Sequence, residues 1–185
     1  MKRFVTLTAV LLLPLLLLAI APKERWFLAG SRPAEYDCHV DPQASYNDQE
    51  STYLGLKEGI HPTGFGTWMT QFDAAPFLGK RVRLTANVRA EGVKGWAGLW
   101  MRVDDQSLPP NARTIAFDNM QNRSIKGSKP WKSYSVVLDV PEHATGIFLG
   151  ILLDGSGGVW LNGVNFEVVD QKVHSTNTLV RRPMY

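Results

Sequence analysis

Apolar and polar residues alternate along several stretches of this chain. In residues 81–89, one parity is apolar throughout and the other is polar; the apolar positions are Val82, Leu84, Ala86 and Val88. Successive side chains of a β-strand point to opposite faces, so this alternation predicts a strand with one buried face. Residues 134–140 alternate in the same way. The continuously apolar residues 146–153 are typical of a central strand covered on both faces, in which Gly150 leaves space beside an aromatic ring.

These stretches are separated by turns rich in Gly and Pro, and no stretch shows a sustained helical period. The organisation predicts an all-β, antiparallel β-sandwich over residues 22–170. Near its end, Asn162 and Gly163 separate two apolar runs of opposite parity, which predicts a β-bulge that resets the buried face. Residues 171–185 have no core pattern, and we expect them to form a flexible C-terminal tail.

Residues 95–105, GWAGLWMRVDD, combine a clean core face with an unusual second face. The core face consists of Ala97, Leu99, Met101 and Val103. The second face carries Trp100, which offers a broad aromatic surface with one polar N–H, and Arg102, whose guanidinium has five donors. This combination suits stacking and hydrogen bonding to a small polar ligand. Trp100 and Arg102 are therefore the leading candidates for a binding site.

Four further residues are expected near this face. Gln71 lies on the polar parity of a neighbouring alternating stretch. If the apolar residues of the following strand at 114–121 face the core, Asp118 and Met120 share the open side with Trp100. Asn119 lies near the end of that strand, where it could also cap the turn that follows.

An alternative interpretation leaves this face without a ligand. Residues 36–66 would cover Trp100, and Arg102 would pair with Asp104 or Asp118. The sequence does not decide between an open and a covered Trp100.

The first residues combine a basic start with a long apolar run. Lys2 and Arg3 precede the uncharged residues 4–21, FVTLTAVLLLPLLLLAIA, which is the pattern of an export signal. The run ends in a small-x-small cleavage pattern, but Pro22 follows at once and suits cleavage poorly. The run is also long enough to span a bilayer. We expect an N-terminal hydrophobic helix at 1–21, either a cleaved signal peptide or an uncleaved signal anchor. The rest of the chain would then be exported, either periplasmic or extracellular, or held at the membrane facing outward.

The charge balance argues against nucleic acid as a partner. The chain has 20 Lys and Arg against 17 Asp and Glu, a net charge of +3, and two of the basic residues precede the apolar run. The remaining basic residues do not form one strongly charged face, which a nucleic-acid-binding protein would need.

Several motifs resemble a known fold family. FLGKRVRLTANVRA, the aromatic-rich strand after it, a lone Trp131 before KSYSVVLDVP, and the closing VWLNGVNFEVV are similar to the jelly-roll sandwich of carbohydrate-binding modules and galactose-binding-like domains. The resemblance covers about residues 26–169 and implies a jelly roll that binds a carbohydrate or another small polar ligand. That family usually has an Asp, often near a structural calcium, where this chain has Asn162. The difference makes a structural calcium less expected here.

A narrower resemblance involves WAGLWMRVD, AFDNMQ, IKG and GFGTWM. These motifs are similar to a group of largely uncharacterised exported bacterial proteins, some of which are labelled transcriptional regulators. Nothing in the sequence resembles a DNA-binding helix-turn-helix, so the resemblance does not extend to that role.

Metal and catalytic chemistry find little support in the sequence. The histidines are isolated and form no HxH or HExxH pair; they are His39, His61, His143 and His174. Asp104 with Asp105, and the DGSGG turn at 154–158, lack the ligand spacing of a calcium loop. A glycosidase would have to pair Asp118 with Glu91 or Asp104. We expect no catalytic residue, no metal and no cofactor.

These observations favour a non-enzymatic, envelope-exposed module that binds a carbohydrate or another small polar ligand on the Trp100/Arg102 face. The alternative is a membrane-tethered structural or protein-interaction module, with residues 4–21 as its membrane contact. A third hypothesis is a small glycoside-acting enzyme that depends on Asp118.

Overall fold

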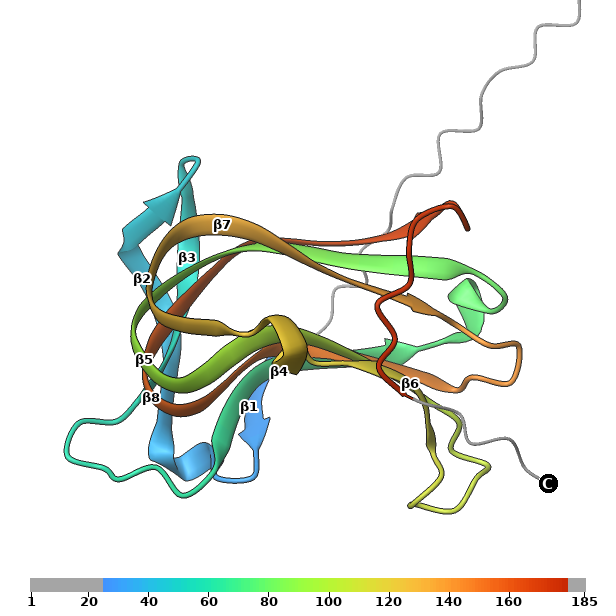
Figure 1. Ribbon diagram of the computed structural model, residues 1–185, viewed down its shortest axis with the longest axis horizontal. Helices are drawn as coiled ribbons and strands as arrows, with labels where there is room; N and C mark the ends of the chain where they lie inside the picture. The colour runs from blue at the N-terminus through green and yellow to red at the C-terminus, as the bar shows by residue number, and fades with distance from the viewer. Residues whose placement is uncertain (1–24, 180–185) are drawn as a thin grey trace, which may run out of the picture.

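The computed structural model describes residues 25–179 and is an antiparallel all-β fold in this range (Figure 1). Its strands are β1 (Phe27–Gly30), β2 (Tyr36–Tyr46), β3 (Gln49–Leu56), β4 (Phe65–Asp73), β5 (Arg81–Asp104), β6 (Thr114–Asp118), β7 (Ile125–Asp139) and β8 (Gly146–Val169). Short 3-10 turns occur at η1 (Pro33–Glu35), η2 (Ala75–Phe77) and η3 (Gln121–Arg123). The predicted antiparallel all-β class is confirmed. The predicted N-terminal helix lies outside the described residues, among which no helix has the length and apolar character to cross a membrane.

The longest strands, β5 and β8, form the centre of the sheet. Each has 24 residues, and they pair from Arg81 opposite Val169 to Asp104 opposite Gly146. The first half of β8 is extended by β4 and then β1, and its second half by β3 and then β2. Strands β6 and β7 pair with the other side of β5. The sheet folds over on itself, and its two layers enclose the main core (Figure 1).

The two stretches predicted as separate strands at 81–89 and 95–105 are one continuous strand. Between them β5 carries a bulge, marked by a register shift between Glu91 and Lys94. The extra residue changes the buried parity. Even-numbered residues from Val82 to Ala90 face the core before the bulge, and Val93 and the odd-numbered residues from Ala97 to Val103 face it afterwards. The alternation within 81–89 and within 95–105 is as predicted. The glycines between the two stretches form a bend inside one strand and not a turn between two strands.

Glycine makes this bend sterically accessible in both strands. Gly95 in β5 and Gly155 in β8 lie opposite each other with φ of +106° and +99°. Residues with a Cβ rarely adopt this conformation. The predicted bulge at Asn162 is also confirmed, because β8 has one more residue than β5 between the pairs Thr85–Asn165 and Asn87–Asn162.

Residues 171–179, which we expected to be part of a flexible tail, dock against two strand edges. The amide of Thr176 donates to the carbonyl of Val137 on β7 (2.8 Å), and its hydroxyl accepts from the Val137 amide (2.9 Å). On β6, Phe117 donates its amide to Asn177 Oδ1 (3.0 Å) and accepts from the Thr178 amide (2.8 Å). Polar side chains and backbone make these contacts, so they leave no apolar pattern in the sequence. Residues 180–185 lie outside the described range.

Replacing Gly155 by alanine is expected to destabilise the fold far more than replacing Gly127. A Cβ at Gly155 would lie against the carbonyl oxygen of Lys94, whereas a Cβ at Gly127, where φ is +68°, would meet nothing within 4 Å. We expect the free energy of unfolding to fall by about 1 kcal/mol in Gly127→Ala and by about 3 kcal/mol or more in Gly155→Ala, where a backbone clash adds to the strain. Chemical denaturation measures both values. Equal losses would contradict the steric account of the bend.

Candidate functional site

A groove lies on the outer face of the layer built from β1, β4, the first half of β8, the second half of β5, and β6. Its volume is about 540 Å³. It is lined by side chains whose parity is opposite to that of the core residues; they include Phe65, Thr67, Met69, Gln71, Trp96, Trp100, Arg102, Phe117, Asn119, Phe148, Leu152 and Asp154. The lining is mainly aromatic and apolar, with a few polar groups among the rings.

The register of the strands sets these side chains in rows. In one row, Gln71, Phe148, Arg102 and Phe117 lie opposite one another on β4, β8, β5 and β6. A second row joins Phe65, Asp154 and Trp96, and the indole N–H of Trp96 donates to Asp154 Oδ2 (3.2 Å). A third row, between these two, places Trp100 opposite Gly150. The pairing of β4 and β5 with the two sides of β8 therefore brings the lining side chains together.

Trp100 forms part of the groove floor and is only 8% exposed. Its indole N–H reaches from β5 past β8 to Thr67 Oγ1 on β4 (2.8 Å). The strand between them has Gly150 opposite Trp100. A Cβ at Gly150 would clash with the backbone of Trp68 and Met69 on β4, so this glycine makes room for the neighbouring strand and not, as predicted, for an aromatic ring. Met69 and Leu152 cluster with Trp100, so the neighbouring strands bury much of it. The overlying segment proposed in the alternative interpretation is not needed to explain its burial.

Arg102 is half-buried and lies over the ring of Phe148, with 4.4 Å between the guanidinium carbon and the ring centre. Its Nη2 is 2.9 Å from Asp104 Oδ2, which is one of the pairings considered from the sequence. Among the described residues, neither Arg102 Nε nor Asp104 Oδ1 has a hydrogen-bond partner. Both of these atoms are buried, so the polar groups that Arg102 exposes to the groove are those of its guanidinium end.

Two of the six candidate residues do not belong to this face. Asp118 is 0% exposed and Met120 is 1% exposed, because both side chains point into the interior. Asp118 lies opposite the core residue Met101, and Phe117 lies opposite Arg102. The assumption that the apolar residues of this strand face the core was therefore wrong for Phe117, which lines the groove. Gln71, Asn119, Trp100 and Arg102 are the four candidates that the structure brings together.

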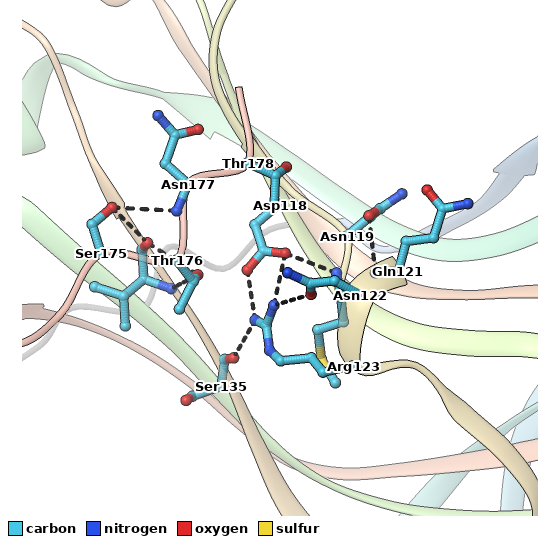
Figure 2. A network of polar contacts seen from close by, with 12 residues as sticks. Asp118, Asn119, Gln121, Asn122, Arg123, Ser135, Ser175, Thr176, Asn177 and Thr178 are labelled. Atoms are coloured by element: carbon cyan, nitrogen blue, oxygen red, sulfur yellow. Dashed lines mark hydrogen bonds and ion pairs between the residues drawn. The ribbon is translucent and has the colours of Figure 1, made fainter. Parts of the chain in front are cut away.

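Asp118 anchors the turn that follows β6 (Figure 2). Its carboxylate accepts hydrogen bonds from Arg123 Nη1 (3.0 Å), Arg123 Nη2 (2.5 Å) and the Met120 amide (2.8 Å). Arg123 Nη2 also donates to the carbonyl of Ser135 on β7 (3.0 Å). A buried charge is tolerated where it is paired in this way. The bidentate partner was not apparent from sequence, because β6 ends between the two residues.

The groove continues beyond β6 into a more polar hollow of about 950 Å³. Phe117 and Asn119 line both, and the docked residues 175–178 and η3 form the rest of the second hollow (Figure 2). Asn119 Oδ1 accepts from the Gln121 amide (3.1 Å), so its NH₂ group remains as a donor. Trp96, Phe117, Phe148 and Asp154 also line the groove, although none of them was predicted as a site residue. Trp96 and Phe148 share parity with Trp100 and Gly150 in their own strands, and that signal was available.

The carboxylates considered for a glycosidase do not meet in one site. Asp118 faces the interior and Asp104 lies on the groove side of β5. Glu91 lies opposite Gly158 on the outer face of the other half of the sheet. Within residues 25–179, no group of three His, Cys, Asp or Glu side chains is arranged to hold a metal ion.

Asn162 has a donor role at the position where the resembling family usually has Asp. Its side-chain nitrogen donates to the carbonyl oxygens of Gln49 and Glu50, both at 3.1 Å. A carboxylate would present oxygen to those two carbonyls and could not form either bond. The amide therefore ties the start of β3 to the bulge of β8.

No protein-family model matches this chain. It is 41% identical over 152 residues to the uncharacterized HTH-type transcriptional regulator YbfP of Bacillus subtilis (strain 168). The match covers 82% of this chain and 50% of that protein, so the chain spans about half the length of this curated relative. Residues 25–179 themselves contain helical turns only of the 3-10 type. Export of this group of proteins is not tested by the match and stays a prediction.

Solved structures with similar folds include carbohydrate-binding modules. The CBM22-1 xylan-binding domain of Paenibacillus barcinonensis Xyn10C has a TM-score of 0.51 at 12% identity, covering 78% of this chain and 85% of that chain. The CBM22-1–GH10 modules of Clostridium thermocellum Xyn10B, complexed with xylohexaose, have a TM-score of 0.54 at 14% identity, covering 78% and 26%. At these identities the similarity shows the fold alone. It confirms the expected resemblance to carbohydrate-binding modules at that level.

The hydrogen bond between Trp100 and Thr67 can be tested with two valine substitutions on β4. Thr67 and Thr70 are both buried, but among the described residues the hydroxyl of Thr70 has no partner. Thr67→Val leaves the Trp100 N–H unpaired, so we expect the free energy of unfolding to fall by about 1–3 kcal/mol. Thr70→Val removes only an unpaired group and should be neutral or stabilising. Thermal and chemical denaturation provide the comparison, and a larger loss in Thr70→Val would contradict the assignment.

Proposed function

We propose that this chain is a non-enzymatic carbohydrate-binding module that holds its ligand in the aromatic groove. The observation that carries the proposal is an outer sheet face on which Trp96, Phe117 and Phe148 surround the Trp100 floor, with Arg102 among them. Ligand sites are typically hollows of this kind, apolar with a few placed polar groups. An aromatic-lined hollow outside the main core has no role in closing that core.

The distribution of polar groups suits a sugar ring. The axial C–H bonds of a pyranose form an apolar face that packs on an aromatic ring, while its hydroxyls project from the edge. In the groove the indole N–H groups of Trp96 and Trp100 already have internal partners. The half-buried Trp96 ring therefore offers mainly apolar surface, above a floor to which Trp100 contributes only a small exposed area. Hydroxyl groups would bond instead to Arg102, Gln71 and the amide of Asn119, which combine donors and acceptors.

The continuation of the groove past β6 supports a chain of sugars as the ligand rather than a single ring. Phe117 and Asn119 belong to both hollows, so a ligand lying on β6 would contact the docked residues 175–178. The fold similarity to the CBM22-1–GH10 modules complexed with xylohexaose is consistent with such a ligand. No bond-making step is assigned, because the candidate carboxylates lie on different faces.

We also propose that residues 1–21 direct the chain out of the cytoplasm, where polysaccharides of the envelope or surroundings are accessible. The basic start and apolar run motivate this proposal. Intact-mass measurement of protein from the membrane fraction is expected to give either the full chain, for an anchor, or a chain lacking the first 21 residues, for a cleaved signal. Full-length protein confined to the soluble cytoplasmic fraction would contradict export.

Replacing Trp96 by alanine is expected to weaken glycan binding about tenfold, because a ring at the groove margin is lost. Isothermal titration calorimetry on the full chain would use xylohexaose and soluble xylan, mixed-linkage β-glucan, galactan and pullulan. Trp131→Ala is the matched control: Trp131 is also half-buried, but it packs against Tyr46 away from the groove. Its affinity should be unchanged.

The two tryptophan variants separate loss of a site from loss of fold. Both should retain the far-ultraviolet circular dichroism and the cooperative melting of the parent. Equal weakening by Trp96→Ala and Trp131→Ala would place binding outside the groove. A folded parent that binds no glycan of the panel would overturn the proposed function.

A further inference from the structure

A second aromatic surface lies on the other half of the sheet. His39 on β2, Tyr53 on β3, Trp160 on β8 and Arg89 on β5 lie opposite one another in a single row across four strands. Ring centres are 5.1 Å apart for His39 and Tyr53, and 5.0 Å apart for Tyr53 and Trp160. The guanidinium carbon of Arg89 lies 4.0 Å from the centre of the Trp160 ring. We call these four side chains the aromatic row.

The aromatic row faces outward and is separate from the groove. Its members have the parity opposite to the core residues Leu54 and Val159, although Trp160 is itself only 9% exposed beneath Arg89. The row uses the second half of β8, after the glycine bend, whereas the groove uses the first half. No residue is shared between the groove lining and the hollow beside the row.

Two glycines give this surface its shape. Gly55 and Gly158 lie opposite each other beside the row, and a Cβ on either would clash with the ring of Tyr53. The ring of Tyr53 therefore lies down against the backbone of both strands. Beside it is a hollow of about 470 Å³, lined by His39, Asp41, Tyr53, Glu91 and Trp160 together with 157–158. A half-buried aromatic ring thus forms one wall of an open hollow.

Hydrogen-bond donors and hydrogen-bond acceptors both border the hollow. Asp41 Oδ2 accepts from the Trp160 indole N–H (2.8 Å), which fixes the edge of that ring. The Glu91 side chain is 68% exposed, and its nearest cationic partner is Arg89, at 3.4 Å. Burial, and secondarily the charges of Asp37 and Glu91, raise the pKa of the Tyr53 phenol, so its hydroxyl keeps its proton at neutral pH. Donors and acceptors therefore lie along the same aromatic wall.

We propose that this hollow is a second binding site and that its ligand is a neutral sugar ring. The aromatic wall suits the C–H face of the ring, and a hydroxyl can donate to Glu91 while accepting from Tyr53 or Arg89. A cationic ligand would compete with Arg89, which already occupies one face of Trp160. An anionic ligand would meet Asp41 and Glu91. The mixture of charges favours an uncharged ligand with many hydroxyls.

The site is independent of the groove and extends what the molecule can do. A chain with two sugar sites on different parts of its surface can hold two glycan strands together, or bind one polymer with increased avidity. The second site does not require that the groove binds sugar.

A site-resolved titration tests this inference. The full chain, labelled with nitrogen-15, would be titrated with the methyl β-glycosides of xylose, glucose, galactose and mannose, using choline as the cationic and glucuronate as the anionic comparator. We expect at least one neutral glycoside to shift the amide resonances of Gly157 and Gly158. Tyr53→Ala and Glu91→Gln should each weaken that response about tenfold, whereas Trp96→Ala in the groove should leave it unchanged.

Glu91→Gln keeps the shape of an exposed side chain, so it remains informative even if Tyr53→Ala fails to fold. The inference is wrong if no neutral glycoside shifts the two glycine amides, if choline or glucuronate shifts them more strongly, or if the response survives Glu91→Gln unchanged. Failure of the proposed groove site is a different result: in calorimetry, Trp96→Ala would leave the affinity for glycans unchanged. The two proposals can therefore fail independently of each other.

Discussion

The pairing of β5 with β8 is the constraint on which the rest of the structure depends. Both strands have 24 residues and their ladder runs between both ends, so neither can change direction unless the other does so at the same level. Glycines on both strands permit that change, and the bulge at Glu91–Lys94 exchanges the parities of β5. The two halves of the ladder thereby turn their apolar faces toward one common core. Their outward faces then point in different directions, one carrying the groove and the other the aromatic row.

Both outward surfaces use indole rings in the same way. The N–H groups of Trp96, Trp100 and Trp160 are bonded to Asp154, Thr67 and Asp41 within the chain. These bonds hold each ring at a fixed angle and satisfy its polar atom. The ring surface that each indole leaves accessible is therefore apolar, and the polar groups of a ligand must find other partners. Preorganised rings of this kind lose little conformational entropy on binding, which favours affinity at a shallow site.

Much of the core could be predicted from sequence because alternation is local. Val82 to Val88 and Ala97 to Val103 are buried as their parity indicated. That these two stretches form one continuous strand could not be predicted, because glycines occur both at a bend inside a strand and at a turn between two strands. Trp100, Arg102, Gln71 and Asn119 were brought to one groove as expected. Asp118 and Met120 were misplaced because β6 has only five residues, too few to reveal its parity, and because Asp118 is neutralised by an arginine beyond the strand. The docking of residues 171–179 depends on hydroxyl and backbone hydrogen bonds, which leave no pattern of apolar residues in the sequence.

That docked segment has a consequence for how copies of the protein behave toward each other. Strands β6 and β7 each have an edge that does not pair with another strand among the described residues, and exposed edges of this kind recruit strands from neighbouring molecules. Thr176 occupies both backbone groups of Val137, and Asn177 with Thr178 occupies both of Phe117. A few polar residues at the end of the chain thus interrupt two potential nuclei for intermolecular sheet growth. Solubility at high concentration would then depend on a segment that contributes almost nothing to the hydrophobic core.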